Sequence, residues 1–290
     1  MAEGKIVKSS GGFYYIQSEG RLYECRARGL FKIKGISPLV GDNVIFSVID
    51  EDSGYILKLL DRRNQIKRPR VVNVDLFCLV VSAKMPEPDF LYIDKVLAMC
   101  EYEGLDCFIC VTKTDLDDAH EYERWSEVYS NIGYKVIYTS SKFSRGIEKL
   151  ELFLSGKVTV FAGNSGVGKS SLANSISPDL HLKVGEISPK SKRGTHTTRH
   201  IELDAIMTNS YVADTPGFTE LSLDYMGKYD LPLCFREFRQ YSCRFSNCLH
   251  RSEPDCGVKE AAGTGNISMS RYMNYLKLLN EIIDEKGKAD

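Results

Sequence analysis

The 290-residue sequence lacks any apolar stretch near the roughly 20 residues that a helix needs to cross a bilayer. The N-terminal run MAEGKIVKSS also lacks the apolar core of a secretory signal. We therefore expect a cytoplasmic protein with no membrane partner. An excess of one charge is absent too, because the formal net charge is only -1. The overall charge thus neither indicates nor excludes binding to nucleic acid.

The sequence also lacks an even number of regularly spaced cysteines, which would indicate a disulfide scaffold. The sequence has nine cysteines, of which six are scattered, mostly in apolar segments. The other three crowd around one histidine near the C-terminus. This pattern predicts reduced thiols and one metal site. An apolar content of 43% and a charged content of 27% are those of an ordinary globular protein, long enough for two or three domains.

Residues 1–68 are expected to form a small β-barrel of the OB type. Short β-branched and aromatic runs, such as GGFYYIQ and DNVIFSVID, are separated by Gly, Ser or Asp, and no long helical pattern interrupts them. Basic residues crowd the exit from this region, namely Arg62, Arg63, Lys67, Arg68 and Arg70. A solvated linker is the simpler interpretation of such a run, although a basic OB barrel with exposed aromatic rings suits RNA.

Residues 69–226 alternate between strand and helix patterns. VDLFCLVVSA is a continuous apolar run of the kind buried in a parallel sheet, and FLYIDKVLAMCEYE follows it with helical periodicity. The alternation predicts a doubly wound α/β domain. Residues 227–290 turn polar, Arg-rich and Cys-rich, and they end in an amphipathic helix. Its apolar stripe is expected to pack in the core and consists of Met273, Leu276, Leu279, Ile282 and Ile283.

A phosphate-binding loop is the clearest motif, because residues 163–170 read GNSGVGKS and fit GxxxxGK[ST]. They follow the apolar strand VTVFA and precede a helical run. Glycines let successive N–H groups surround an anion, and the helix adds its positive end. Lys169 is expected to reach the β- and γ-phosphates, and the Ser170 hydroxyl to bind Mg²⁺. The predicted nucleotide-binding residues here are Gly163, Asn164, Ser165, Gly166, Val167, Gly168, Lys169, Ser170 and Ser171.

A guanine-recognition motif is predicted at residues 112–115, which read TKTD at the end of the strand LDCFICV. The Asp115 carboxylate can accept hydrogen bonds from both N1–H and the 2-amino group of guanine, whereas adenine would leave it unpaired. The tetrad resembles the GTPase motif NKxD, with Thr112 in place of Asn and with Lys113 retained. TSSK at residues 139–142 resembles the loop that backs the guanine, which adds Ser140 and Ser141. A plain turn is the alternative interpretation of TSSK.

The magnesium motif and the switch segment complete the predicted site. Residues 214–217 read DTPG, where Asp214 is expected to hold Mg²⁺ through water and Gly217 to meet the γ-phosphate. In the switch segment upstream, either Thr197 or Thr198 is expected to bind Mg²⁺. Phe218 stands where many GTPases carry Gln, which predicts slow intrinsic hydrolysis. His196, or a group supplied by a partner, would then complete the catalytic site.

The order of these motifs is permuted. In ordinary GTPases the phosphate loop comes first, whereas here the base-recognition tetrad precedes it and DTPG comes last. A parallel sheet tolerates such rewiring if the old termini are joined and new ones open at a surface loop.

A structural zinc site is predicted near the C-terminus. Cys243, Cys248, His250 and Cys256 supply three thiolates and one imidazole within fourteen residues, which suits tetrahedral Zn²⁺ with no open position. The pair Cys107 and Cys110 also reads CxxC, but it lies within an apolar strand and is expected to pack in the core. Four arginines near the zinc ligands are candidates for phosphate contacts, namely Arg236, Arg239, Arg244 and Arg251.

The whole chain resembles the bacterial family of ribosome small-subunit-dependent GTPases, RsgA (also called YjeQ). The resemblance rests on the basic barrel, the order TKTD, GNSGVGKS, THTT and DTPG, and the string CRFSNCLHRSEPDC. It implies binding to the 30S ribosomal subunit and its 16S rRNA, GTPase stimulation by that subunit and a role in its late maturation. It also implies GTP/GDP, Mg²⁺ and one structural Zn²⁺ as cofactors, and we expect a monomer.

Two other functions remain open at this point. The first is an RNA-binding adaptor in which zinc and barrel bind RNA and the nucleotide site only holds structure. The second is a phosphate-loop ATPase or kinase, against which Asp115 argues.

Overall fold

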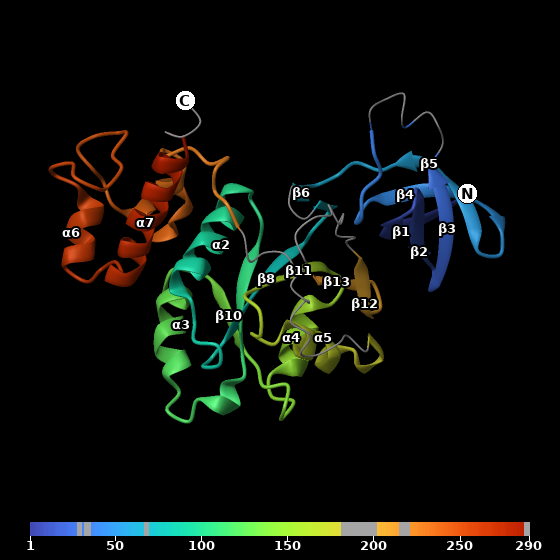
Figure 1. The fold of residues 1–290 in the computed structure, drawn as a ribbon, viewed down its shortest axis with the longest axis horizontal. Coiled ribbons are helices and arrows are strands. Elements are labelled where there is room, and N and C mark those ends of the chain that lie inside the picture. The colour runs from blue at the N-terminus through green and yellow to red at the C-terminus, as the bar shows by residue number, and fades with distance from the viewer. Residues whose placement is uncertain (28–30, 32–35, 67–69, 181–201, 215–220, 287–290) are drawn as a thin grey trace, which may run out of the picture.

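The computed structural model describes residues 1–27, 31, 36–66, 70–180, 202–214 and 221–286. Three units lie in a row in Figure 1: an N-terminal barrel, a central α/β unit and a C-terminal helical unit. Their order and architecture confirm the predicted fold class. The predicted domain boundaries at residues 68 and 226 stay predictions. No helix in these described ranges is long and apolar enough to cross a membrane.

The barrel consists of five strands that close in the order β1-β2-β3-β5-β4. Their bounds are β1 Ala2–Ser10, β2 Phe13–Ser18, β3 Arg21–Ala27, β4 Asn43–Asp50 and β5 Ser53–Leu59. Neighbouring strands are antiparallel except for β3 and β5. The side chains that point inward are apolar and include Ile6, Ile16, Val44, Phe46 and Ile56, all fully buried.

A short connecting segment joins the barrel to the central unit. Its strands β6 (Gln65–Ile66) and β7 (Val71–Val72) pair with each other. Gly41 has a φ of +95°, and a Cβ at this position would lie 2.0 Å from the carbonyl oxygen of Val72. Only glycine permits this close approach of the barrel to β7.

Two of the basic residues at the barrel exit lie in this connecting segment, between β5 and β6. Arg62 Nε lies 2.7 Å from Oδ1 of the buried Asp42, and Arg63 lies 2.6 Å from Asp75. Both cations therefore have a carboxylate partner within the protein, while the Arg63 side chain is still 63% exposed to solvent. The sequence could not show this, because each carboxylate lies elsewhere along the chain. Arg70 is exposed, while Lys67 and Arg68 lie outside the described residues.

The central unit is built on a six-stranded sheet with the order β10-β9-β8-β11-β13-β12. The strands are β8 Leu76–Ser82, β9 Cys107–Thr112, β10 Lys135–Tyr138, β11 Val158–Ala162, β12 Leu203–Met207 and β13 Ser210–Asp214. All are parallel to their neighbours except β12, which runs antiparallel to β13 at the edge.

Helices cover both faces of this sheet. Helices α2 (Phe90–Tyr102) and α3 (Glu121–Asn131) pack on one face, and α4 (Ile147–Leu154) and α5 (Lys169–Ile176) on the other. Short 3₁₀ helices η1 (Thr114–Leu116) and η2 (Pro178–Leu180) follow β9 and α5. Side chains alternate along the buried strands, so that each face has its own apolar cluster. This is the predicted doubly wound arrangement.

The C-terminal unit contains η4 (Leu231–Cys234), η5 (Arg236–Gln240), α6 (Gly257–Gly263) and α7 (Met269–Lys286). The predicted apolar stripe of α7 was partly wrong, because Met273 is 48% exposed. The buried face instead includes Tyr272 and Tyr275, whose hydroxyl groups donate to the main-chain carbonyls of His250 and Leu249. These tyrosines pack as apolar residues because their polar ends have partners.

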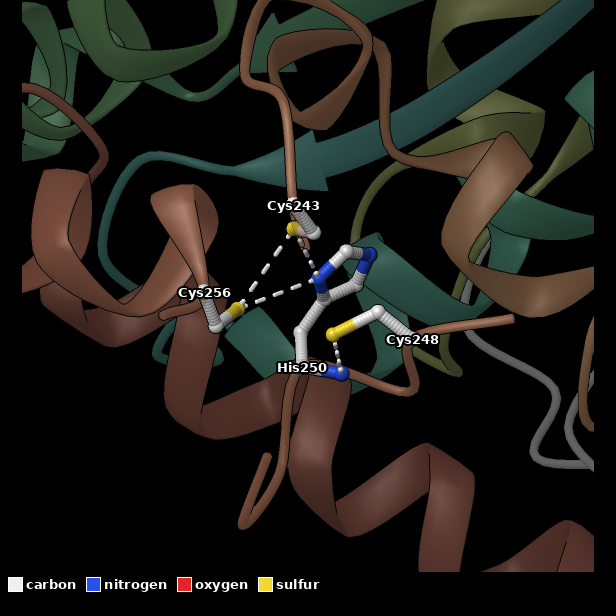
Figure 2. A group of neighbouring side chains, drawn as sticks. All are labelled: Cys243, Cys248, His250 and Cys256. Carbon is white, nitrogen blue, oxygen red and sulfur yellow. Dashed lines mark hydrogen bonds between the residues drawn. The ribbon is translucent and has the colours of Figure 1, made fainter. Parts of the chain in front are cut away.

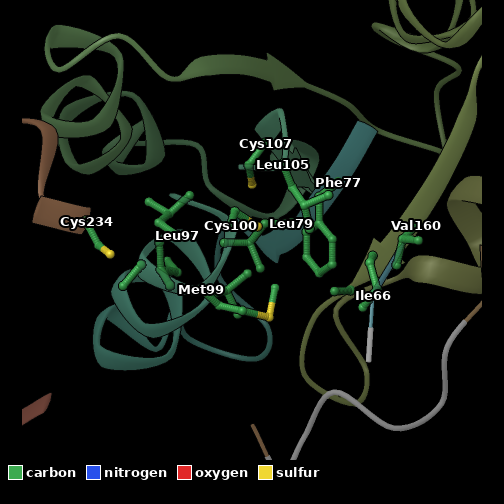
Figure 3. Close-up of a cluster of buried hydrophobic side chains, with 14 of the residues drawn as sticks. Ile66, Phe77, Leu79, Leu97, Met99, Cys100, Leu105, Cys107, Val160 and Cys234 are labelled. Carbon is green, nitrogen blue, oxygen red and sulfur yellow. The ribbon is translucent and has the colours of Figure 1, made fainter. Parts of the chain in front are cut away.

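The core of the central unit continues into the C-terminal unit through α2. In Figure 3, Leu97 and Cys100 of α2 lie between Phe77 of β8 and Cys234 of η4, within one buried cluster. A buried charged group crosses the same interface. The guanidinium of Arg271 on α7 donates to Asp94 on α2 and to Glu237 on η5.

Candidate nucleotide site and metal centre

The predicted nucleotide-binding segments gather at one edge of the central sheet. The segments TKTD, TSSK and the phosphate loop follow the carboxyl ends of the parallel strands β9, β10 and β11. Because β8 lies between β9 and β11, the chain crosses over at this point in the sheet. Ligands of open α/β sheets bind in the crevice that such a crossover creates.

The phosphate loop connects β11 to α5. Gly163, Gly166 and Gly168 have positive φ angles, and a Cβ on Gly163 would lie 2.3 Å from the carbonyl oxygen of Val80. The N-terminal turn of α5 starts directly after the loop, at Lys169. Lys169 Nζ donates to the carbonyls of Gly163 at 2.8 Å and of Asn164 at 3.0 Å. The loop thus combines close backbone approach, a helix N-terminus and an amine, which together fit a polyphosphate.

The base-recognition tetrad contacts the phosphate loop directly. The buried Thr112 hydroxyl donates to the carbonyl of Val167 at 2.5 Å, although the two residues are 55 positions apart. Lys113 Nζ donates to the carbonyl of Gly166 at 2.6 Å and to that of Met85 at 2.5 Å. The two permuted motifs therefore contact each other directly in the folded chain. Thr112, which departs from the usual Asn, still supplies a donor to the phosphate loop.

Asp115 lies beside the TSSK loop. The Ser140 hydroxyl donates to Asp115 Oδ1 at 2.5 Å, and the Thr114 amide donates to the carbonyl of Thr139 at 3.3 Å. Oδ2 of Asp115 accepts no hydrogen bond from the part of the chain that the structure describes. The carboxylate is thus oriented on one side and open on the other, as the recognition of two neighbouring donors requires. Ser141 follows Ser140 and is partly exposed.

The remaining predicted residues differ in how far the structure describes them. Asp214 ends β13 opposite Phe161 of β11, so its main chain lies next to the strand that leads into the phosphate loop. Ser170 and Ser171 lie in the first turn of α5, and Ser165 is exposed in the loop. The predicted catalytic residues His196, Thr197, Thr198 and Gly217 lie outside the described residues.

The segment after β8 also contacts the predicted nucleotide site, which the sequence did not indicate. Met85 accepts the second hydrogen bond of Lys113, and Asp89 accepts from the amide of Tyr92 and so caps α2. Ser82 is buried, its hydroxyl has no hydrogen-bond partner among the described residues, and it lines a cavity of about 10 Å³ beside Asn164. A cavity of this size holds about one water molecule. The only sequence signal was Asp89, an N-cap residue before a helical run.

The four predicted zinc ligands converge on one point, as Figure 2 shows. Their ligand atoms all lie within 4.8 Å of one another. Cys243 Sγ lies 3.7 Å from Cys256 Sγ and 3.4 Å from His250 Nδ1. Sulfurs at two corners of a tetrahedral zinc site lie about 3.8 Å apart. The cluster therefore fits a four-coordinate Zn²⁺ that His250 would bind through Nδ1.

The protonation of the ligands fits the same conclusion. Burial lowers the pKa of His250, which keeps the imidazole neutral and able to bind a metal. Burial also raises the pKa of Cys248 to about 12, so a thiolate there needs a nearby cation. A Zn²⁺ ion held by these four residues would supply that cation.

The loop between His250 and Cys256 is held by Glu253. Its carboxylate accepts hydrogen bonds from the main-chain amides of Leu249, Arg251 and Ser252. Burial by itself would raise the pKa of Glu253, but these amides outweigh it and lower the pKa to about 2. Glu253 therefore stays ionised at neutral pH and fixes the ligand loop.

Three of the four arginines near the metal centre already have protein partners. Arg236 and Arg239 each lie 2.7 Å from Glu101 on α2, and Arg244 lies 3.0 Å from Asp255. Arg236 and Arg239 thus fasten the C-terminal unit to the central unit, and their contact with phosphates stays a prediction. Glu101 is far away in the sequence, so spacing could not reveal the pairs. Cys107 and Cys110 are buried in β9, away from the metal centre.

Comparison with known proteins identifies the family. Two family models match this chain, described as RsgA GTPase over residues 59–224 and RsgA N-terminal domain over residues 3–56. The protein named small ribosomal subunit biogenesis GTPase RsgA from Geobacillus thermodenitrificans is 45% identical over 99% of this chain and all of its own length. Its counterpart from Alkaliphilus metalliredigens is 43% identical over 97% of this chain and 98% of its own.

Two solved structures share the whole architecture. YloQ, described as a circularly permuted GTPase, superposes with a TM-score of 0.81 at 36% identity and covers 98% of this chain and 96% of its own. YjeQ from Thermotoga maritima superposes with a TM-score of 0.83 at 37% identity and covers 97% of this chain and 98% of its own. The permuted fold described for YloQ agrees with the motif order of this chain, in which the segment 112–115 precedes and contacts the phosphate loop. The chain therefore belongs to the RsgA GTPase family and is a GTP hydrolase with permuted motifs.

Proposed function

We propose that this protein binds the small (30S) ribosomal subunit, hydrolyses GTP to GDP and phosphate when that subunit stimulates it, and assists late maturation of the subunit. The observation that carries the proposal is the contact between Thr112 and the phosphate loop, which assembles one nucleotide site from permuted motifs. Relatives that match nearly the whole chain are named for small-subunit biogenesis. Work on ribosomal subunits would place the protein in the cytoplasm, as a monomer on each subunit.

Each part of the nucleotide has a residue to hold it. Asp115 would accept from the guanine edge, and the amide of Ser141 would back the base. The phosphate-loop amides and Lys169 would surround the β- and γ-phosphates. Ser170 and Asp214 would hold Mg²⁺, which neutralises charge that develops on the phosphates during transfer. Either Thr197 or Thr198 would sense the γ-phosphate.

Hydrolysis would depend on the partner because the site lacks its own water-positioning glutamine. Phe218 follows DTPG and cannot orient a water molecule by hydrogen bonding. His196 or a group on the ribosomal subunit would take that role. A low rate alone and a higher rate on the subunit follow from this arrangement.

The nucleotide state would reach the C-terminal unit through α2. Lys113 contacts Met85 in the segment before α2, and α2 carries Asp94 and Glu101, which bind arginines of the C-terminal unit. A change at the phosphate loop therefore has a continuous path to the zinc-bearing unit. GTP would favour the subunit-bound state, and hydrolysis would favour release. The barrel and the C-terminal unit stand at opposite ends in Figure 1, which suits simultaneous contact with 16S rRNA.

Phosphate release, measured with and without purified 30S subunits, tests the proposal. We expect stimulation for the wild-type protein with GTP, little turnover of ATP, and loss of turnover in Lys169→Ala. Equal rates with and without subunits would contradict the proposal and favour an RNA-binding adaptor with a structural nucleotide site. Equal subunit affinity with GDP and with a non-hydrolysable GTP analogue would exclude the release step.

A further inference from the structure

We propose that the loop at residues 140–145 is a contact point for unpaired RNA, with Phe143 as the platform on which one base stacks. The inference rests on the proposed function, because the RNA in question is that of the small ribosomal subunit. It assigns a role to a loop tip that the nucleotide site itself does not use.

The loop is built to project its tip. Ser140 and Arg145 exchange two main-chain hydrogen bonds, of 3.0 and 3.1 Å, which close the loop at its base. Ser144 has a φ of +52°, and Gly146 has a φ of +72° with a Cβ position only 2.0 Å from the carbonyl of Tyr138. These constraints fix the turn, so Phe143 does not fold back and is 54% exposed.

Two cations lie over the exposed ring of Phe143. Lys142 Nζ lies 5.2 Å from the centroid of the Phe143 ring, and the Arg145 guanidinium carbon lies 5.3 Å from it. The segment TSSKFSRG at residues 139–146 contains these two cations, three serines and no carboxylate. An exposed aromatic ring offers stacking to a base, and neighbouring cations meet the phosphates on either side of it. Single-stranded nucleic acid therefore fits the tip better than a protein partner does.

The same loop also supports the guanine-recognition carboxylate. Ser140 at its base holds Asp115 Oδ1 at 2.5 Å, only three residues before Phe143. RNA bound at the tip and guanine bound at Asp115 would therefore share one small structural element. By linkage, each would change the affinity of the other by the same factor.

Affinity for purified 30S subunits, measured with a non-hydrolysable GTP analogue, tests the contact. We expect Phe143→Ala to weaken binding about fivefold or more, which is the lower range for removal of one stacked base. Phe143→Tyr retains the ring and is expected to bind within about twofold of wild type. Leu152→Ala is the matched control, because Leu152 is also exposed, at 74%, on α4 of the same unit.

The roles of Lys142 and Arg145 are tested by a separate measurement. Removal of both cations, in Lys142→Ala with Arg145→Ala, is expected to make the dependence of log affinity on log salt shallower by about one unit or more. A photoreactive phenylalanine analogue at position 143 is expected to cross-link to rRNA.

The outcomes separate this inference from the proposed function. Wild-type protein that fails to bind 30S subunits overturns both. Normal wild-type binding, with Phe143→Ala no weaker than Leu152→Ala, overturns the RNA contact alone. A cross-link to a ribosomal protein in place of rRNA also overturns it. GDP affinity of the free Phe143→Ala protein is expected to stay within about twofold of wild type, which shows that the fold is intact.

Discussion

The hydroxyl of Thr112 donates a hydrogen bond to the main-chain carbonyl of Val167, and this bond joins the base-recognition tetrad to the phosphate loop. In the chain the tetrad precedes the loop, whereas the sheet brings them together because β9 and β11 flank β8. One side chain thus links the two segments that are predicted to hold the two ends of the nucleotide. Thr112 is 3% exposed, so water cannot replace its hydroxyl if the residue changes.

Thr112→Val keeps the shape of this side chain and removes the donor. The carbonyl of Val167 would lose its partner in a buried position, at a cost of about 1–2 kcal/mol. We therefore expect nucleotide affinity to fall about 5- to 30-fold. Thr112→Ser restores the hydroxyl and is the matched control. Titration with a fluorescent GDP analogue measures both, and a Thr112→Val protein as tight as wild type would show that the bond does not support the loop.

Asp115→Asn is expected to change base preference from guanine to xanthine. Guanine would lose its acceptor for two hydrogen bonds to a charged group, each worth roughly 1.5–3 kcal/mol, which predicts a loss of about 100-fold or more. Xanthine carries a carbonyl in place of the 2-amino group and can accept from the new amide. Competition between GTP and XTP measures the change. Asp118→Asn, an exposed carboxylate nearby, is the control and is expected to keep GTP preference.

Motif spacing and strand patterns sufficed to predict the barrel, the parallel sheet and the Cys/His cluster, whereas the nucleotide-binding roles of the phosphate-loop residues stay predictions. Each of these depends on residues that are close in sequence, such as Cys243 to Cys256. The segment TSSK resembles the guanine-backing loop only loosely in sequence. In the structure it has a defined geometry, since Ser140 donates to Asp115. Long-range polar partners were invisible, because nothing near Arg271 indicates that Asp94, 177 residues away, lies opposite it.

The buried face of α7 shows a second limit. Hydropathy favoured Met273, but Tyr275 occupies the core because its hydroxyl has a carbonyl partner. A pattern that scores tyrosine as polar cannot anticipate a hydrogen bond that only the folded chain provides.

Arg271→Met is expected to destabilise the protein by about 3–5 kcal/mol, because two carboxylates, Asp94 and Glu237, would remain buried without their counter-charge. Lys95→Met is the control at the same interface. Its ion pair with Glu281 is partly exposed, so a loss of about 0–1 kcal/mol is expected. Urea unfolding followed by the fluorescence of Trp125, the single tryptophan, measures both. Equal losses in the two variants would show that the buried group has no special role.

One zinc ion per chain is expected in protein purified without chelator, measured by elemental mass spectrometry. Cys256→Ser is expected to lose most of the metal and to loosen the C-terminal unit, because metal binding and local folding are linked. Cys234→Ser is the matched control, since Cys234 is also buried in the C-terminal unit and instead donates to the carbonyl of Asp230. Full zinc content in Cys256→Ser, or loss in Cys234→Ser, would contradict the assignment of ligands.

The junction between the barrel and the edge of the central sheet yields the last prediction. Lys8 on β1 lies 2.8 Å from the carboxylate of Glu202, and the same two residues form an isolated antiparallel bridge. Glu202 lies near the end of the predicted switch segment, which covers residues 188–203. The hydrogen bond to Glu202 raises the pKa of Lys8, so Lys8 stays charged at neutral pH. If the barrel positions the switch through this pair, either charge reversal alone is expected to lower subunit-stimulated hydrolysis and leave the basal rate unchanged.

The double reversal, Lys8→Glu with Glu202→Lys, separates this coupling from a direct RNA contact. The swapped pair restores the attraction between β1 and the residue before β12, so stimulated hydrolysis is expected to recover. A direct contact between Lys8 and rRNA would instead leave the double variant as weak as Lys8→Glu, because a carboxylate would still face the phosphates. Both side chains are partly exposed, so the free energy of unfolding is expected to change by no more than about 1 kcal/mol in any of the three variants. A larger change in the free energy of unfolding would show that the lower hydrolysis results from lost stability alone.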